Sequence, residues 1–128
     1  MVSKERLIDA FGELIYALAF ADGVVDQKEI QTLHDILENH PWASGIEWSF
    51  QYEAEHKSSV AAAYEKALQT FKEYGPAPEY KYLLEILEAV AMASKGKHQK
   101  EEKIIQDFQN ELVEQFLKDL ELHRLKNW

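Results

Sequence analysis

Residues 7–29 have the sequence LIDAFGELIYALAFADGVVDQKE, which combines an apolar helix, a tight turn and the start of a second helix. In its first half, large apolar side chains recur at intervals of four, three and four residues, at Leu7, Phe11, Leu14 and Leu18. This spacing is typical of one face of an α-helix, which completes a turn about every 3.6 residues. The pattern therefore predicts a helix that buries this face against the rest of the protein.

A turn follows this helix at Asp22-Gly23, where glycine allows a left-handed backbone. Asp26 and Glu29 then have the spacing of a capping box, in which the two side chains bond to backbone N–H groups at the start of a helix. We expect a second helix after Asp26 that ends just before Pro41, because the residue before a proline disfavours helical geometry. The two helices form a predicted hairpin.

The rest of the chain also follows the helical period, and strand-like alternation is absent from the sequence. Further helices are predicted from residue 59 to the proline-rich turn at 75–78, from about residue 80 to 95, and from about 98 to 122. Residues 41–57 are expected to form a loop with one short helix, interrupted at Ser44-Gly45. The prediction is a single all-α domain over residues 1–128, a helical bundle of five to seven helices.

The sequence also resembles itself at an offset of 72 residues. LIYALAFAD at residues 14–22 aligns with ILEAVAMAS at residues 86–94, and the match continues through the turn that follows. Two pseudo-repeated helical hairpins, at about 3–39 and 79–122, are therefore predicted to pack together with pseudo-twofold symmetry, because neither buries its apolar face alone. The alternative is a chance similarity of two alanine-rich amphipathic helices.

Composition excludes several classes of function. The chain of 128 residues has 14 Lys and Arg against 23 Asp and Glu, a net charge of −9, and it contains no cysteine. Disulfides and thiolate metal sites are therefore excluded, and repulsion by the phosphate backbone disfavours nucleic acid as a partner. No apolar run approaches the roughly 20 residues that span a bilayer, so direct membrane insertion is not expected. Charges where a signal peptide would be apolar favour a cytoplasmic protein.

The turn between the first two helices carries a possible ion site. Asp22, Asp26 and Glu29 follow the spacing Asp-Gly-x-x-Asp-x-x-Glu, as in the later half of an EF-hand loop. Leu18 and Phe20 occupy the first and third positions of such a loop and cannot coordinate a metal, so a complete EF-hand is excluded. The three carboxylates are enough for weak or partner-completed binding of a divalent cation.

The same residues also have a purely structural interpretation, which the residue chemistry by itself favours. Asp26 would cap the second helix, Glu29 would close the capping box, and Asp22 would cap or solvate the turn. In the second repeat, Ser94 replaces Asp22 and only Glu101, the equivalent of Glu29, persists. That second turn is a poorer ion site.

The sequence at these turns resembles the tellurite-resistance TerB family and its TerB-like relatives. The resemblance is carried by AFADGVVDQKE at residues 19–29 and by a weaker echo at residues 91–101, and it extends to length, acidity and the helical repeat. It implies a compact all-helical fold with both acidic turns on one face. It also implies a site for a divalent cation (Ca²⁺, Mg²⁺ or Zn²⁺) formed by Asp22, Asp26, Glu29 and Glu101.

The resemblance further implies a role without catalysis. Proteins of this type are associated with bacterial resistance to tellurite and other stresses, and similar domains precede J-domains in membrane-anchored co-chaperones. We therefore expect a non-enzymatic module that binds a divalent cation weakly and acts through protein partners, including membrane-associated ones. The alternative is a purely structural protein-interaction domain without metal, related to the co-chaperone-associated domains.

An aromatic segment offers a second candidate for partner binding. Its members fall between residues 42 and 52, at Trp42, Trp48, Phe50 and Tyr52. They form either an exposed patch, because aromatic residues dominate interface hot spots, or a lid over the helical core. The lid is the favoured prediction, since large apolar side chains usually point inward.

No sequence motif supports an enzyme. Glu53 and His56 have the Glu-x-x-His spacing of di-iron bundles, but that site needs a second copy, and a solvated polar face is predicted instead. The chain has no His-x-x-x-His pair, no Gly-rich phosphate loop and no basic stripe. A metal-assisted hydrolase would need a deep pocket in which the turn carboxylates meet His98.

Overall fold

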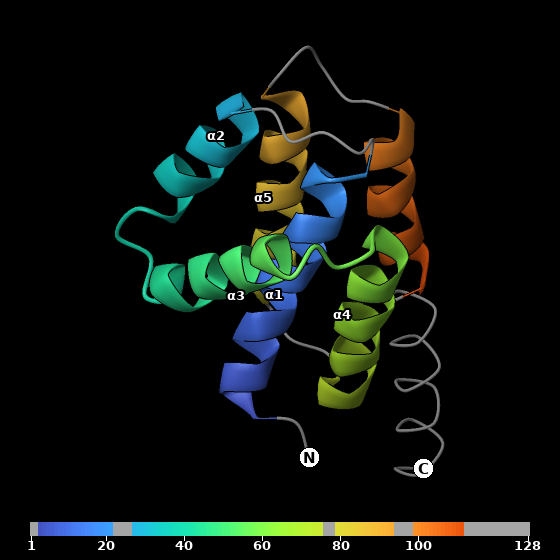
Figure 1. The fold of residues 1–128 in the computed structure, drawn as a ribbon. Helices are drawn as coiled ribbons and strands as arrows, with labels where there is room; N and C mark the ends of the chain where they lie inside the picture. Colours follow the sequence, from blue (N-terminus) through green and yellow to red (C-terminus); the bar gives the residue numbers. More distant parts are fainter. Residues whose placement is uncertain (1–2, 22–26, 76–78, 94–98, 112–128) are drawn as a thin grey trace, which may run out of the picture.

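The computed structural model describes residues 3–21, 27–75, 79–93 and 99–111. Residues 99–111 are helical, and every other element in the described part of the chain is also a helix (Figure 1). The five helices before this segment are α1 (Lys4–Ala19), α2 (Gln27–Leu37), α3 (Ala43–Glu55), α4 (Val60–Tyr74) and α5 (Glu79–Met92). The predicted all-α bundle is confirmed.

α1 is the central helix of the bundle. It packs against α3, α4 and α5, and every residue from Ala10 to Ala19 is buried. The sequence predicted one apolar face on this helix. In the structure, other helices cover most of its surface, and this agrees with the almost uniformly apolar residues of its second half. Ser3 is the N-cap, and its side chain accepts a hydrogen bond from the Arg6 backbone N–H.

α3 is more regular than the predicted loop with one interrupted helix. It runs unbroken through Ser44-Gly45, so the expected interruption is wrong. The small residues serve packing instead, because a Cβ at Gly45 would lie 2.7 Å from Cγ2 of Ile8 on α1. α1 and α3 also approach each other closely further along α1, where a Cβ at Gly12 would lie 2.6 Å from the backbone oxygen of Ile46.

The remaining helices follow the predicted pattern. Ser59 is the N-cap of α4, and its side chain accepts a hydrogen bond from the Ala62 N–H. Gly75, with φ of +90°, is the C-cap. α2 packs against α5, whereas α3 packs against α1, so these neighbouring elements splay apart (Figure 1). The predicted last helix is described as far as residue 111, and the remainder of its predicted span lies outside the described residues.

Aromatic contacts join the two halves of the core. Phe11 on α1 meets Phe71 on α4 with ring centroids 5.8 Å apart, and Phe71 meets Phe108 of the 99–111 helix at 5.4 Å. These rings are fully buried, and edge-to-face pairs of this kind add to the hydrophobic stabilisation. Among the described residues, no helix combines the length and the apolar character needed to cross a bilayer.

Candidate functional site

The four predicted ligands divide into two groups. Asp22 and Asp26 lie outside the described residues, as do Ser94 and His98 of the second turn. Glu29 is the third residue of α2 and is only 4% exposed. Glu101, its equivalent in the second repeat, lies near the start of the 99–111 helix and is 3% exposed. The structure thus buries both glutamates that the predicted repeat aligns.

Burial of these two carboxylates is unusual, because Glu is almost never fully buried unless it has a partner. Both take part in interactions in the structure. A Glu at the third position of a helix is well placed for the N–H groups of the first turn, and the positive end of the helix dipole favours its charge. The position of Glu29 therefore agrees with the predicted capping box as well as with a ligand role.

The helix ends that flank the two turns lie at one end of the molecule. In Figure 1, α1 and α5 finish at the top, and α2 and the 99–111 helix begin there. α2 and the 99–111 helix stand on opposite sides of the α1 and α5 pair in this view. Glu29 and Glu101 therefore belong to the same end of the bundle, on separate helices.

The described residues do not by themselves make a metal centre. No group of three or more His, Asp or Glu side chains that could hold a metal ion occurs among them. A complete site at this end needs Asp22 and Asp26 in addition to Glu29. The donor chemistry is consistent, since carboxylate oxygens are the ligands that Ca²⁺ and Mg²⁺ prefer.

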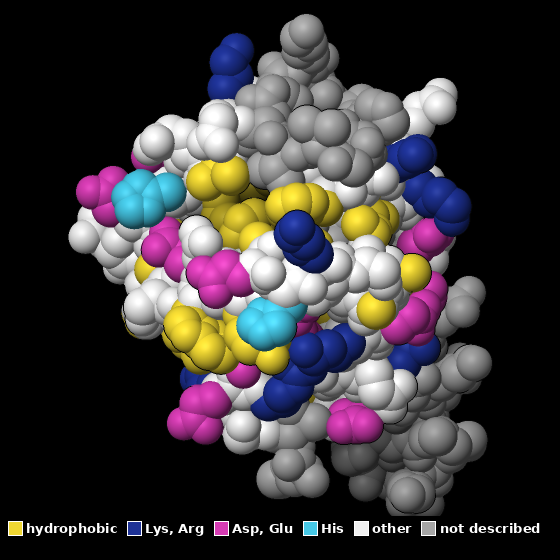
Figure 2. All heavy atoms as spheres, in the orientation of Figure 1, with side chains coloured by type: hydrophobic (Ala, Val, Ile, Leu, Met, Phe, Trp, Pro, Cys, Tyr) yellow, Lys and Arg dark blue, Asp and Glu magenta, His cyan; other side chains and the backbone are white. Residues whose placement is uncertain are grey.

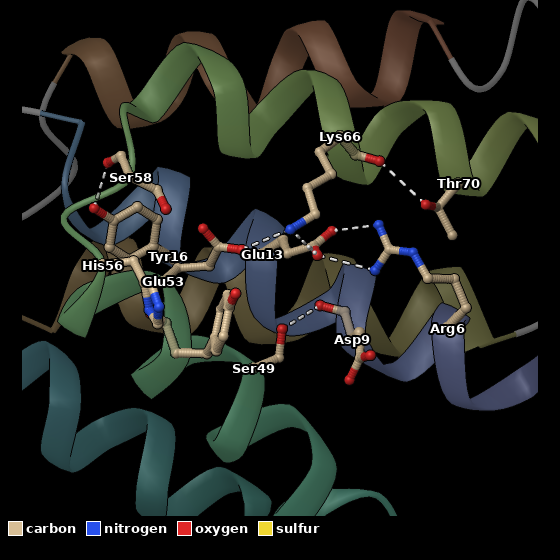
Figure 3. A network of polar contacts seen from close by, with 11 residues as sticks. Arg6, Asp9, Glu13, Tyr16, Ser49, Glu53, His56, Ser58, Lys66 and Thr70 are labelled. Carbon is tan, nitrogen blue, oxygen red and sulfur yellow. Dashed lines mark hydrogen bonds and ion pairs between the residues drawn. The ribbon is translucent and has the colours of Figure 1, made fainter.

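A second polar cluster, which the sequence did not reveal, lies between α1, α3 and α4 (Figure 3). Arg6 donates two hydrogen bonds to the carboxylate of Glu13, at 2.9 and 3.0 Å. The ammonium of Lys66 lies 3.2 Å from Glu13 and 3.0 Å from Glu53. Glu13 and Glu53 are 2% and 3% exposed, so two buried carboxylates share two basic side chains.

The electrostatics of this cluster favour its charged form. Burial raises the pKa of Glu53, but hydrogen bonds from Ser58 and Lys66 and the charges of Lys66 and His56 outweigh it, so the pKa falls below its usual range. For Lys66, burial by itself would lower the pKa, but the contacts with Glu53 and Glu13 raise it overall. The prediction of a solvated face at Glu53 is wrong, because Lys66 of α4 covers this carboxylate.

The cluster is a structural device that holds three helices together. Tyr16 donates a 2.6 Å hydrogen bond to the Ser58 carbonyl, and Ser49 donates one of 2.6 Å to the Asp9 carbonyl, so further polar contacts tie α1 to α3 and to the α3–α4 connection. Arg6 and Glu13 lie on the same helix, α1. The sequence carried no signal that Lys66 and Glu53 join them, because these residues meet only through the crossing of the helices.

Comparison with the sequence models of known families gives a match over most of the chain. The sequence model of the family described as "Tellurite resistance protein TerB" matches residues 9–113. The chain belongs to the TerB family. The match includes both turns together with Glu29 and Glu101 of this TerB domain, so the resemblance to this family is confirmed. TerB is a tellurite-resistance-type family and is not a known enzyme family. No curated protein and no solved structure matches the chain.

The aromatic segment of this TerB domain is divided between core and surface. Trp42 packs edge-on against Phe11 with centroids 5.3 Å apart, and Phe50 is 5% exposed, as the predicted lid requires. Trp48 and Tyr52, in contrast, are 62% and 42% exposed. The lid is therefore right for the first pair of side chains and wrong for the second. An α-helix explains the division, because residues two positions apart point to different sides.

Proposed function

We propose that this TerB domain is a non-enzymatic module that binds a divalent cation at the acidic end of the bundle. Asp22, Asp26 and Glu29 would supply the ligands, and Glu101 would add its charge from the second repeat. The domain would act through protein partners in a bacterial stress response of the tellurite-resistance type. The observation that carries the proposal is the burial of Glu29 and Glu101 at the end of the bundle where α2 and the 99–111 helix begin.

Electrostatics support this assignment. Removing a carboxylate from water costs several kcal/mol unless a cation or hydrogen-bond donors compensate it. Glu29 and Glu101 both take part in interactions in the structure. A divalent cation beside two or more carboxylates would add to this compensation. The bound ion would neutralise the acidic turn and fix the connection between α1 and α2.

The donor set favours hard cations. Zn²⁺ sites in proteins are built mostly from cysteine and histidine, whereas Ca²⁺ and Mg²⁺ take oxygen ligands. The chain has no cysteine, and the four proposed residues are all carboxylates. We therefore expect Ca²⁺ or Mg²⁺ to bind more tightly than Zn²⁺. Since the ligands at the first and third EF-hand positions are missing, the affinity should be well below that of a complete EF-hand.

Titration calorimetry on chelator-treated protein tests the proposal. We expect one saturable site for Ca²⁺ or Mg²⁺, and a loss of affinity of at least tenfold in an Asp22→Asn/Asp26→Asn double variant. Glu55→Gln, which removes an exposed carboxylate at the end of α3, is the matched control and should leave the affinity unchanged. Absence of both binding heat and any shift in melting temperature would refute cation binding.

A second candidate function is a protein-interaction domain without metal, and the helical position of Glu29 favours it. Glu29 is the third residue of α2, where a capping box places either Glu or Gln. Under this alternative, Glu29→Gln keeps the capping interaction and leaves stability nearly unchanged, whether or not cation is present. Under the cation proposal, the same variant binds the ion more weakly. Calorimetry and thermal melting of this single variant separate the two functions.

A further inference from the structure

α2 and α3 enclose an open groove on the surface. Its volume is about 380 Å³, and its apolar walls are formed by Ile30 and Leu33 of α2 and by Trp48 and Phe50 of α3. Figure 2 shows this face, with a hollow bordered by hydrophobic side chains. The groove exists because α2 packs on α5 while α3 packs on α1, which leaves the facing sides of the two helices apart.

A row of stacked rings continues the apolar surface along α3. Trp48 and Tyr52 stack with centroids 5.5 Å apart, and Tyr52 stacks on His56 at 4.0 Å. The three residues are four positions apart and share one face of the helix. We call them the aromatic ladder. Exposed, pre-stacked Trp and Tyr side chains are typical of binding hot spots, because they lose little conformational entropy when a partner covers them.

The rim of the groove is polar, and a contact joins its two sides. His34 of α2 and Glu47 of α3 approach to 3.1 Å between Nδ1 and Oε1, so one side-chain contact bridges the two helices. Both side chains remain accessible, at 65% and 38% exposure. An apolar floor with a polar rim is the arrangement found at specific protein interfaces.

Charge indicates what kind of partner fits this surface. Between residues 27 and 55 the chain carries one lysine, Lys28, and six acidic residues, Glu29, Asp35, Glu38, Glu47, Glu53 and Glu55. Glu29 and Glu53 are buried, and the other four remain accessible around the two helices. A partner in the groove therefore meets more negative than positive charge on α2 and α3, which basic side chains on its flanks would complement. Further along the ladder, the Lys66 ammonium of α4 lies 6.0 Å from the centroid of the Tyr52 ring.

We propose that the α2–α3 groove and the aromatic ladder bind a basic amphipathic helix of a partner protein. Its apolar residues would occupy the groove beside Leu33 and cover Trp48, and its Lys or Arg residues would face Glu47 and the neighbouring carboxylates. Amphipathic helices bind to apolar grooves in this manner by anchors spaced three or four residues apart. The inference rests on the protein-partner half of the proposed function and names its surface. It does not require the cation.

A synthetic probe tests this inference on the full chain after chelator treatment. The probe is an 18-residue peptide of Leu and Lys with helical spacing. Its controls are a Leu and Glu peptide of the same spacing and a scrambled Leu and Lys peptide without an apolar face. We expect the first peptide to bind at least tenfold more tightly than either control. Its NMR shifts should concentrate on the Trp48 indole and the Leu33 methyl groups.

Matched variants locate the binding surface. Trp48→Ala removes a side chain that is 62% exposed, so the fold should be kept, and it should weaken peptide binding at least tenfold. Met92→Ala removes another exposed apolar side chain, on α5 and outside the groove, and should change binding less than twofold. Circular dichroism and melting curves verify that both variants are folded.

Three outcomes would overturn the inference. One is equal binding by the scrambled peptide, which would mean unspecific attraction to an acidic protein. Another is an equal effect of Trp48→Ala and Met92→Ala. The third is concentration-dependent shifts of the groove resonances with dimer formation, which would assign the surface to a second copy of the chain. Since the cation is measured separately, failure here with intact cation binding leaves that part of the proposed function standing.

Discussion

Glu13 and Glu53 are almost completely buried, and each keeps its carboxylate in contact with a basic side chain from elsewhere in the chain. Lys66 serves both carboxylates and is itself half exposed. Its long side chain reaches over α4 to the acidic pair while the opposite side of its ammonium stays in water. Loss of this one cation would therefore leave two buried acids with less compensation.

We predict that Lys66→Ala lowers the free energy of unfolding by about 2 kcal/mol, because buried charged groups lose a hydrogen-bond partner. Lys103→Ala is the matched control. Lys103 pairs with Asp107 at 2.8 Å on an exposed helix surface, and pairs of this kind contribute little. Urea denaturation at neutral pH measures both variants. An equal effect of the two substitutions would contradict the structural role of the cluster.

The pKa of Glu53 gives a second prediction, on pH dependence. Although burial raises this pKa, hydrogen bonds from Ser58 and Lys66 lower it overall. A depressed carboxyl pKa contributes stability that is present above the pKa of the unfolded chain and is lost as the pH falls through the folded pKa. The native protein should lose this contribution below about pH 5.

Glu53→Gln tests this pH dependence, because an amide does not titrate. The variant should be less stable than the native protein at neutral pH, and the difference should shrink as the pH falls. Glu55→Gln, on the exposed side of α3, should follow the native curve. Urea denaturation between pH 7 and acid pH gives the comparison. Parallel curves for the native protein and Glu53→Gln would exclude the assigned pKa shift.

Among the helical elements, the crossing of α1 and α3 depends on two glycines. A Cβ at Gly12 would lie 2.6 Å from both the Ile46 oxygen and the Ser49 Cβ, and 2.9 Å from the Phe50 nitrogen. Two of these atoms belong to the α3 backbone and have no free rotation to relieve the clash. At Gly45 the close neighbour is only the Ile8 side chain.

We predict that Gly12→Ala destabilises the protein by about 1–3 kcal/mol, as expected for overpacking of a core contact. This is the opposite of the gain of about 1 kcal/mol that alanine normally gives over glycine in a helix. Gly45→Ala should cost less, because the Ile8 side chain can move. Thermal melting of the two variants compares them. A gain in stability for Gly12→Ala would mean that the helices can move apart at no cost.

The helices show how far the sequence predicts this fold. Apolar spacing located α1, α4 and α5 and fixed the all-α class, because amphipathic periodicity is a local property. Ser44-Gly45 misled the prediction, since a glycine that serves helix packing has the same appearance as one that ends a helix. The cluster around Lys66 was missed for a different reason. Lys66 meets Glu13 and Glu53 only through the crossing of three helices, which no local pattern encodes.

The structure describes only part of the predicted ion site. Glu29 and Glu101 are both buried, and their role as ligands stays a prediction. Asp22 and Asp26 lie outside the described residues, so their role stays a prediction. The groove between α2 and α3 carried no sequence signal, because it arises from the way each helix packs on a different neighbour. The exposure of Trp48 and Tyr52 follows from the same geometry.

For the whole molecule, stabilisation by general charge screening must be distinguished from stabilisation by an ion bound at one site. At −9, the chain should gain some stability from any salt, because screening reduces the repulsion among its carboxylates. Binding at a defined site differs in two respects: it saturates, and it depends on particular residues. A cation at about 100 times its dissociation constant adds about 2.7 kcal/mol to the stability of the folded state.

We therefore predict that saturating Ca²⁺ raises the melting temperature by roughly 10 °C, using the shift of a few degrees per kcal/mol typical of domains of this size. NaCl at the same ionic strength should give a much smaller rise, since it screens charge without occupying a site. The Asp22→Asn/Asp26→Asn variant should lose the Ca²⁺-specific part and keep the salt effect. If Ca²⁺ and NaCl act equally on the native protein, the acidity of the chain is a diffuse surface property, and the turn at residues 22–29 holds no ion.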